Sequence, residues 1–107
     1  MEEIIHHTDY INWAEIRGFP GPADGKMLRD DPSTGARAML VRIPPGGEII
    51  PHGHRGIVQH YILQGQYESD GKLFGQGCYR MIPAHIDIPP MTTENGVTIL
   101  MIYDPVA

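Results

Sequence analysis

Short apolar runs alternate with polar, turn-forming segments along this chain, and the pattern predicts β-strands. Four runs rich in β-branched, aliphatic and aromatic residues stand out, at 36–43, 57–63, 79–82 and 97–103. Thirteen glycines and ten prolines separate them, and these residues interrupt long helices. Regular short strands divided by turn signals favour an all-β fold, either a sandwich or a barrel.

The turn segments add local detail to this prediction. Residues 69–72 (Ser-Asp-Gly-Lys) and 94–96 (Glu-Asn-Gly) each predict a hairpin turn with antiparallel flanking strands. The first 17 residues contain no Gly or Pro, and two structures fit them. Thr8 could cap a short helix that runs through Trp13, or the segment could be an edge strand.

Length and composition indicate one compact domain. The chain has 107 residues, of which 41% are hydrophobic and 20% charged, as in an ordinary globular protein. We expect a single domain over 1–107, with a core at about 36–103 and residues 1–35 packing on it as strands or an arm. The only cysteine, Cys78, excludes an internal disulfide, and we expect it to be a small buried hydrophobe.

Charge narrows the range of partners. The formal net charge is −5 and the basic residues are scattered singly, which argues against nucleic acid as a partner. The chain opens with Met1-Glu2-Glu3, and no apolar run approaches the roughly 20 residues that span a bilayer. These features predict no signal peptide, no membrane partner and a cytoplasmic location.

Histidines carry the clearest chemical signal. Six occur in the chain, and His52 and His54 are two residues apart. Residues i and i+2 of a strand share a face, so the two imidazoles could converge on one metal ion. Neutral imidazole is a good ligand for Zn, Fe, Ni, Cu and Mn. The spacing alone fits equally well with two surface histidines in a loop.

The context of this pair resembles the cupin family. Residues 46–54 (GGEIIPHGH) lead into 58–67 (VQHYILQGQY), which resembles the family's first motif, and 77–85 (GCYRMIPAH) is similar to its second. The resemblance covers about residues 36–103 and is closest to small one-domain cupins of the ChrR type. It implies an all-β jelly-roll barrel (a double-stranded β-helix), one divalent metal ion in its mouth (Fe, Mn, Ni or Zn), and a homodimer.

The chain departs from the first motif at the family's glutamate. The resemblance puts that position at Val58 or Gln59, and neither carries a carboxylate. Gln59 could coordinate a metal through its amide oxygen. His60 is the rival third ligand, because it shares strand parity with Val58.

A second departure falls at the family's last histidine. The resemblance puts this position at Ile88, which cannot bind a metal. His85 could replace it if the turn is rearranged, or it could lie beside the site. Nearby apolar strand residues could line a substrate pocket in the barrel or could be plain core. These are Tyr61, Tyr67, Tyr79 and Met81.

Two functions fit these residues. The first is a metal-dependent enzyme that acts on a small organic substrate, and neutral ligands favour Fe(II) dioxygenase-type chemistry within that class. The second is a non-enzymatic cupin that binds a metal or small ligand for sensing or storage. The missing glutamate and last histidine favour the second, since catalysis depends on such groups.

Overall fold

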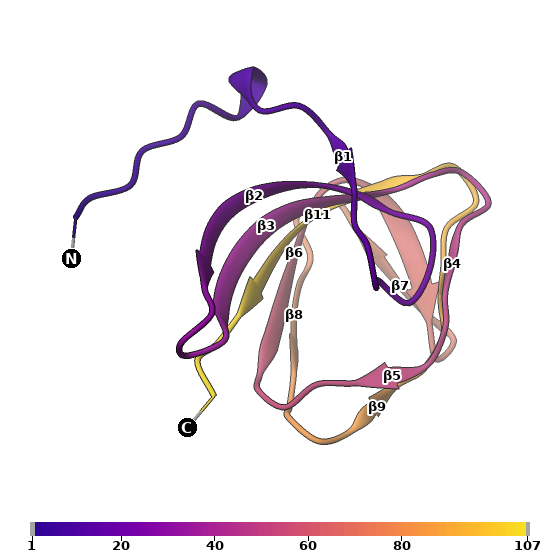
Figure 1. The fold of residues 1–107 in the computed structure, drawn as a ribbon. Coiled ribbons are helices and arrows are strands. Elements are labelled where there is room, and N and C mark those ends of the chain that lie inside the picture. The colour runs from indigo at the N-terminus through magenta and orange to yellow at the C-terminus, as the bar shows by residue number, and fades with distance from the viewer. Residues whose placement is uncertain (1, 107) are drawn as a thin grey trace.

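The computed structural model describes residues 2–106, and they form an almost entirely β structure (Figure 1). In chain order the described elements are the 3-10 helix η1 (Thr8–Tyr10) and the strands β1 (Ala14–Glu15), β2 (Asp24–Asp31), β3 (Ala36–Ile43), β4 (Glu48–Ile49), β5 (His52–Gly53), β6 (Val58–Ser69), β7 (Lys72–Gly75), β8 (Tyr79–Ile82), β9 (Asp87–Ile88), β10 (Met91–Thr92) and β11 (Val97–Tyr103). The all-β prediction is confirmed.

The strands form one large curled sheet and one small sheet that faces part of it (Figure 1). Within residues 2–106 the large sheet has nine strands, ordered β1-β2-β3-β11-β6-β10-β4, with β7 and β8 also paired to β6. β5 and β9 form the two-stranded sheet. All of these pairings are antiparallel, so apolar side chains gather on the concave face of the curled sheet.

Three of the four predicted strands match the structure at both ends: β3, β8 and β11. The fourth, β6, is longer than its apolar run and continues to Ser69. β2 contains no apolar run, because its sequence is mostly polar (DGKMLRDD). Most of its residues remain partly exposed. Pairing with β3 holds it in place, which a search for apolar runs cannot detect.

The two predicted hairpins have different outcomes. Asp70 and Gly71 both have positive φ, at 53° and 73°, and the turn joins the paired strands β6 and β7 as predicted. The turn at 94–96 joins β10 to β11, but the hairpin prediction there is wrong. β10 pairs with the far end of β6 at Glu68 and Ser69, whereas β11 pairs with residues 58–65 of that strand. The two strands therefore diverge along β6.

A β-bulge in β6 decides which of its side chains face inward. Ile62 pairs with Ile99 and Gln64 pairs with Thr98, so Leu63 is an extra residue. Gly65 follows with φ +76°, and a Cβ there would collide with the Gly96 carbonyl oxygen. The alternation of buried and exposed side chains along β6 consequently shifts by one residue. Even-numbered residues are buried before the bulge, and odd-numbered residues after it.

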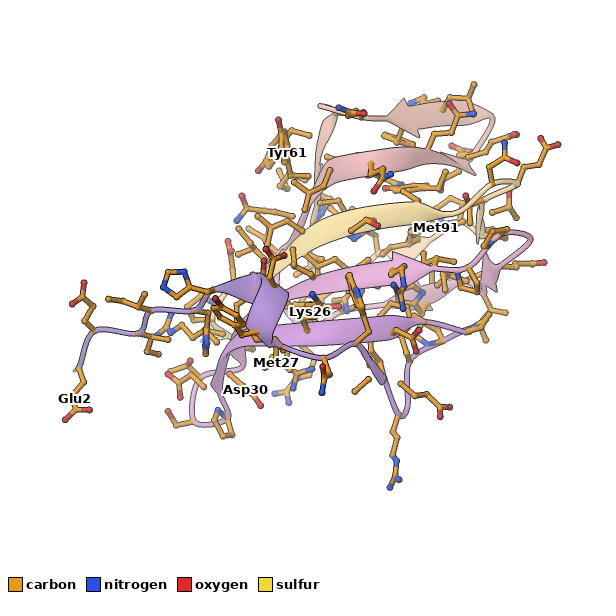
Figure 2. All side chains as sticks on the ribbon, turned by 90° about the horizontal axis from the view of Figure 1, so that it is seen from above. Glu2, Lys26, Met27, Asp30, Tyr61 and Met91 are labelled. Carbon is orange, nitrogen blue, oxygen red and sulfur yellow. The ribbon has the colours of Figure 1, made fainter. Side chains whose placement is uncertain are left out.

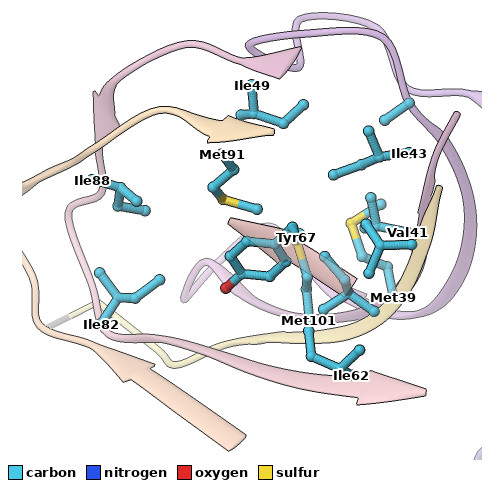
Figure 3. Packing of buried hydrophobic residues seen from close by; sticks show 13 residues of the cluster. Met39, Val41, Ile43, Ile49, Ile62, Tyr67, Ile82, Ile88, Met91 and Met101 are labelled. Carbon is cyan, nitrogen blue, oxygen red and sulfur yellow. The ribbon is translucent and has the colours of Figure 1, made fainter. Parts of the chain in front are cut away.

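The core lies within the curl of the large sheet (Figure 3). Its members are Ala23, Met39, Val41, Ile43, Ile49, Ile62, Tyr67, Ile82, Ile88, Met91, Val97, Ile99 and Met101. Full burial of one such side chain stabilises the fold by about 1.5–3 kcal/mol. Tyr67 lies among them with its hydroxyl directed toward Ile82 and Ile88 (Figure 3). This polar group is therefore presented to the side of the core that β8 and β9 border.

The N-terminal segment combines parts of both expected structures. Its helix is the three-residue η1, capped by His7 without a side-chain hydrogen bond, so a helix capped by Thr8 and reaching Trp13 is wrong. The edge-strand alternative is realised over β1, which pairs with β2. The residues before η1 extend beyond the sheet toward Glu2 (Figure 2). In residues 2–106 no helix is long and apolar enough to cross a membrane.

Candidate metal centre

His52 and His54 lie together at the end of the small sheet. His52 pairs with Ile88 across β5 and β9, and directly opposite residues of a sheet share a face. Because Ile88 is fully buried in the core, His52 also faces the core side. The two imidazoles meet edge to face, with ring centroids 4.8 Å apart and an interplanar angle of 88°. The expected convergence of these two side chains is present in the structure.

A backbone contact fixes the chemical form of His52. Its Nδ1 lies 2.8 Å from the Ile50 carbonyl oxygen. A carbonyl can only accept a hydrogen bond, so Nδ1 carries a proton, and in the neutral ring the lone pair is on Nε2. Metal-binding histidines characteristically hold their second ring nitrogen in this way. His52 is therefore preorganised as a ligand through Nε2.

His54 is also in a form suited to metal binding. Burial lowers the pKa of its imidazole, and the neighbouring His52 lowers it further. The ring packs edge-on against Tyr103, with centroids 5.6 Å apart. A pocket of about 310 Å³ borders His54 and Tyr103, and this volume is in the range of small-molecule sites. A larger cavity of about 790 Å³, bordered by Gln64 and Gly96, touches none of the histidines.

His60 lies inside the barrel, in a hydrogen-bonded network with Tyr67 and Arg80. Its Nδ1 is 2.9 Å from the Tyr67 hydroxyl, and Arg80 Nη1 donates to the same hydroxyl at 3.2 Å. The Arg80 guanidinium lies over the Phe74 ring, 4.6 Å from its centroid, and Phe74 stacks on Tyr67. The bulge in β6 makes this network possible, because His60 and Tyr67 are seven residues apart and both face inward.

The His60 imidazole is neutral in this environment. Burial, together with the charge of Arg80 and then of His54 and His52, lowers its pKa to about 3. A neutral ring is the form that can bind a metal ion. The same contributions show that Arg80 and the histidine pair lie within electrostatic reach of His60.

No inward-facing side chain takes the place of the family's last histidine. Ile88 is part of the core, opposite His52. The backbone N–H of His85 donates to the His54 carbonyl oxygen at 2.8 Å, and its φ is +65°. The His85 side chain is exposed. His85 therefore supports the loop beside the pair through its backbone.

Gln59 lies on the face of β6 opposite to His60. Its amide nitrogen donates to Asp104 at 2.8 Å, and its amide oxygen accepts from the Tyr79 hydroxyl at 2.7 Å. Both ends of the amide are thus engaged on the outer side of the sheet. The structure does not bring Gln59 together with His52 and His54.

Only one of the four expected pocket residues lies inside. Tyr67 is 1% exposed, whereas Tyr61, Tyr79 and Met81 are 43%, 58% and 49% exposed on the outer face. Tyr61 and Tyr67 have the same sequence parity, so simple alternation puts them on one face. The bulge between them separates the two faces.

The side chains at the histidine pair suit some metal ions better than others. His52 and His54 offer two imidazoles, which suit Zn, Fe, Ni and Mn better than Ca or Mg. Among residues 2–106, no three His, Cys, Asp or Glu side chains lie close enough to hold an ion. The pair therefore fits two coordination positions, and a third ligand of these four residue types requires a side chain to move.

Two residues of this region escaped the sequence analysis. Arg80 is the single charged residue of β8, and its parity with the buried Ile82 could have identified it as inward-facing. Tyr103 ends β11 and packs on His54. Burial raises the pKa of its hydroxyl, although Arg37 partly offsets this effect. No motif marks Tyr103, because its position depends on the register of β11.

A curled antiparallel sheet, with one histidine on a short strand beside it and the other just after that strand, is the arrangement expected from the cupin resemblance. The whole chain, residues 1–107, matches the family model of the ChrR Cupin-like domain. The protein therefore belongs to this family, and the resemblance noted in the sequence is confirmed. Among curated proteins no relative matches.

Solved structures share the fold at low sequence identity. A protein provisionally assigned as an acetylacetone dioxygenase from Methylibium petroleiphilum PM1 is 16% identical with a TM-score of 0.85, and the match covers 100% of this chain and 88% of that one. An acetylacetone dioxygenase from Acinetobacter johnsonii is 17% identical with a TM-score of 0.80, covering 96% and 74%. The complex of Rhodobacter sphaeroides SigE with the anti-sigma ChrR contains a chain 23% identical with a TM-score of 0.73, covering 92% and 52%. These similarities establish the fold.

Proposed function

We propose that this chain is a metal-binding cupin of small-molecule metabolism, in which His52 and His54 hold one divalent ion. The observation that carries the proposal is the preorganised pair, with its 4.8 Å ring separation and the Nδ1 of His52 bonded to the Ile50 carbonyl. A bound transition metal supplies open coordination positions and Lewis-acid or redox chemistry. The protein supplies two imidazoles and an apolar core behind them, which limits access of water to that side.

The reaction class we propose is dioxygenase chemistry on a small dicarbonyl compound. Its support is the ligand type and the acetylacetone dioxygenases that share the fold. The alternative is a non-enzymatic cupin for sensing or storage, and its support is the lack of a third close His, Cys, Asp or Glu among residues 2–106. Oxygen consumption by the iron-loaded protein with acetylacetone separates the two. Uptake that depends on substrate supports the enzyme, and stoichiometric binding without uptake supports the alternative.

Metal analysis tests the site itself. We expect about one Fe, Mn, Ni or Zn ion per chain in the purified protein, and loss of that ion in the His52→Ala, His54→Ala double variant. Loss of two ligands should weaken binding by at least about a hundredfold, since each ligand contributes substantially to the binding free energy. Full metal content in the double variant would contradict the assignment. A Tyr61→Phe variant on the outer face serves as the control.

For the third ligand we propose His60. It is favoured over Gln59 because it faces inward and is neutral, whereas the Gln59 amide is bonded to Asp104 and Tyr79. His85 ranks below both, because its side chain is exposed. Metal titration of three variants tests this ranking. His60→Ala should weaken binding by about tenfold or more, the lower end of the effects seen for metal-site residues. Gln59→Glu and His85→Ala should change it little, and tightening by Gln59→Glu would reverse the order.

We also propose a homodimer, and a cytoplasmic location remains a prediction. The N-terminal arm carries Ile4, Ile5 and Tyr10 at 55%, 69% and 88% exposure. The outer sheet face exposes Tyr61, Leu63, Tyr79, Met81 and Ile102. Closed two-fold dimers are the commonest assembly, and these two apolar surfaces could cover each other between copies. Sedimentation at high micromolar concentration should give a dimer, and a chain lacking residues 2–7 should dissociate more readily.

A further inference from the structure

Arg80 is a positively charged side chain that has no acidic partner within residues 2–106. Among residues 2–106 the ion pairs are Arg37 with Asp30 and Arg42 with Asp24, and both lie at the surface. Arg80, in contrast, is partly buried, and its one side-chain hydrogen bond in this part of the chain is Nη1 to the Tyr67 hydroxyl. The protein carries a net charge of −5, yet no carboxylate of the described residues forms an ion pair with this guanidinium.

The unused donors of Arg80 remain accessible. The Nε and Nη2 atoms have no hydrogen-bond partner in the described residues. No buried side-chain nitrogen or oxygen there lacks a partner, so these two atoms are reached by solvent. The aromatic contact with Phe74 holds the guanidinium plane in place. A planar, fixed fork with free N–H groups matches a carboxylate or another two-oxygen anion.

Arg80 borders the same interior side as the histidine pair. It lies opposite the inward-facing His60 and bonds to the Tyr67 hydroxyl, which points toward Ile82 and Ile88 (Figure 3). Ile88 in turn lies opposite His52. No acidic side chain of residues 2–106 joins the pair in a cluster. The carboxylates nearest the pair, Asp87 beside Gly53 and Asp104 in the pocket with His54, form no ion pair with Arg80.

We propose that Arg80 is a specificity-determining residue and that the small molecule bound here is a carboxylate anion. This rests on the proposed function for the location of the site and extends it to the substrate class. The anion accepts hydrogen bonds from Nε and Nη2 of Arg80, while Tyr67 and Phe74 hold the guanidinium in position. A small organic acid is thus favoured over its neutral ester.

Binding of two matched probes to the metal-free protein tests this inference. Acetoacetate and methyl acetoacetate share a dicarbonyl skeleton and differ in charge. The wild type should bind acetoacetate about tenfold more tightly, the increment expected for one charge-assisted hydrogen-bonding site. Arg80→Gln should remove the preference, and Arg80→Lys, which keeps the charge but loses the fork, should retain part of it. In the wild type, the Arg80 Nε–H resonance should shift on addition of acetoacetate.

Three outcomes would overturn the proposal: equal affinity for both probes in the wild type, an unchanged preference in Arg80→Gln, or an Arg80 resonance unmoved by acetoacetate. Loss of the preference in Arg55→Gln instead would move the anion to the pocket beside His54, which Arg55 borders. Arg42→Gln, at a surface arginine paired with Asp24, is the neutral control. Metal content is measured separately in the same variants. An Arg80-dependent preference without metal binding would reject the proposed function and leave this inference standing.

Discussion

The histidine pair and His60 are the same residue type in two different settings. His52 and His54 are partly exposed, one on a two-residue strand and the other just after it, and the pair is held mainly by backbone contacts of the loops around it. His60 is 2% exposed on the twelve-residue β6, with Tyr67 and Arg80 bonded around it. The pair keeps a ring nitrogen available, whereas the buried histidine contributes to internal packing and polarity. The histidine pair is therefore open to ligands, whereas His60 contributes to the interior next to the pair.

Because of this difference, the two regions should contribute differently to folding stability and to metal binding. Removing the pair should cost little folding stability, because half-exposed side chains are weakly coupled to the core. Disturbing the network around His60 should be costly, because buried polar groups left without partners are destabilising.

The largest effect should come from Gly65→Ala. A Cβ at this position collides with the Gly96 carbonyl oxygen, and φ +76° is unfavourable for alanine. We expect a loss of about 3 kcal/mol or more in the free energy of unfolding, measured by denaturant titration. Gly71→Ala, also at positive φ but with open space around it, should cost less. Equal losses in both variants would mean that the collision is relieved at no cost.

Tyr67→Phe should come next. It keeps the ring in the core but removes the hydroxyl that meets His60 Nδ1 and Arg80 Nη1. We expect a loss of about 1–3 kcal/mol in the metal-free protein, because a buried imidazole loses its partner. Tyr61→Phe on the outer face is the matched control and should fall within about 0.5 kcal/mol of the wild type. A neutral outcome for Tyr67→Phe would reduce the network to simple packing.

Acid should destabilise the metal-free fold through His60. Its folded-state pKa is lowered to about 3, below the unfolded value of 6.5, so the unfolded chain binds more protons in that window. Stability is fully present above pH 6.5 and falls as the pH drops toward 3, by at most about 1.4 kcal/mol per unit. The lowered pKa of His54 acts in the same direction. Unfolding titrations at several pH values should show a smaller slope for His60→Gln than for the wild type.

The smallest stability change should come from the histidine pair, and it tests the difference between the pair and His60 most directly. His52→Gln and His54→Gln should each change the stability of the metal-free protein by less than about 1 kcal/mol. The same variants should lose metal binding, so their thermal stabilisation by added metal should disappear. A large loss of metal-free stability in either variant would make the pair a structural element as well.

Much of the fold could be predicted from the chain, since apolar runs bounded by Gly and Pro mark strands directly. β3, β8 and β11 match their runs at both ends because each packs one face on the core. β2 was not predictable in this way, since its polar sequence relies on pairing with β3. The hairpin expected at 94–96 failed for a related reason. Turn chemistry fixes the reversal of the chain, but not which strands then pair.

The site could be predicted only in part. The spacing of His52 and His54 was sufficient to bring them together, because their contact is local. Tyr61, Tyr79 and Met81 lie outside, contrary to the expected pocket, because the assignment assumed unbroken alternation along β6. Arg80 was missed because its importance comes from partners on β6 and β7. Strand parity with Ile82 could have marked Arg80 as inward-facing, but its contacts with Tyr67 and Phe74 leave no trace in a local pattern.

The extra residue at Leu63 has a consequence for how this protein tolerates change. Across β6, substitutions should be tolerated at every second position, as in any half-buried strand. At the bulge, however, the tolerant positions should change from odd-numbered to even-numbered residues. Before Leu63 the even positions are constrained, and after Gly65 the odd ones are. Deleting a single residue here would restore an unbroken rhythm and turn Tyr67 toward solvent. The length of this strand, as much as its composition, therefore determines the lining of the barrel.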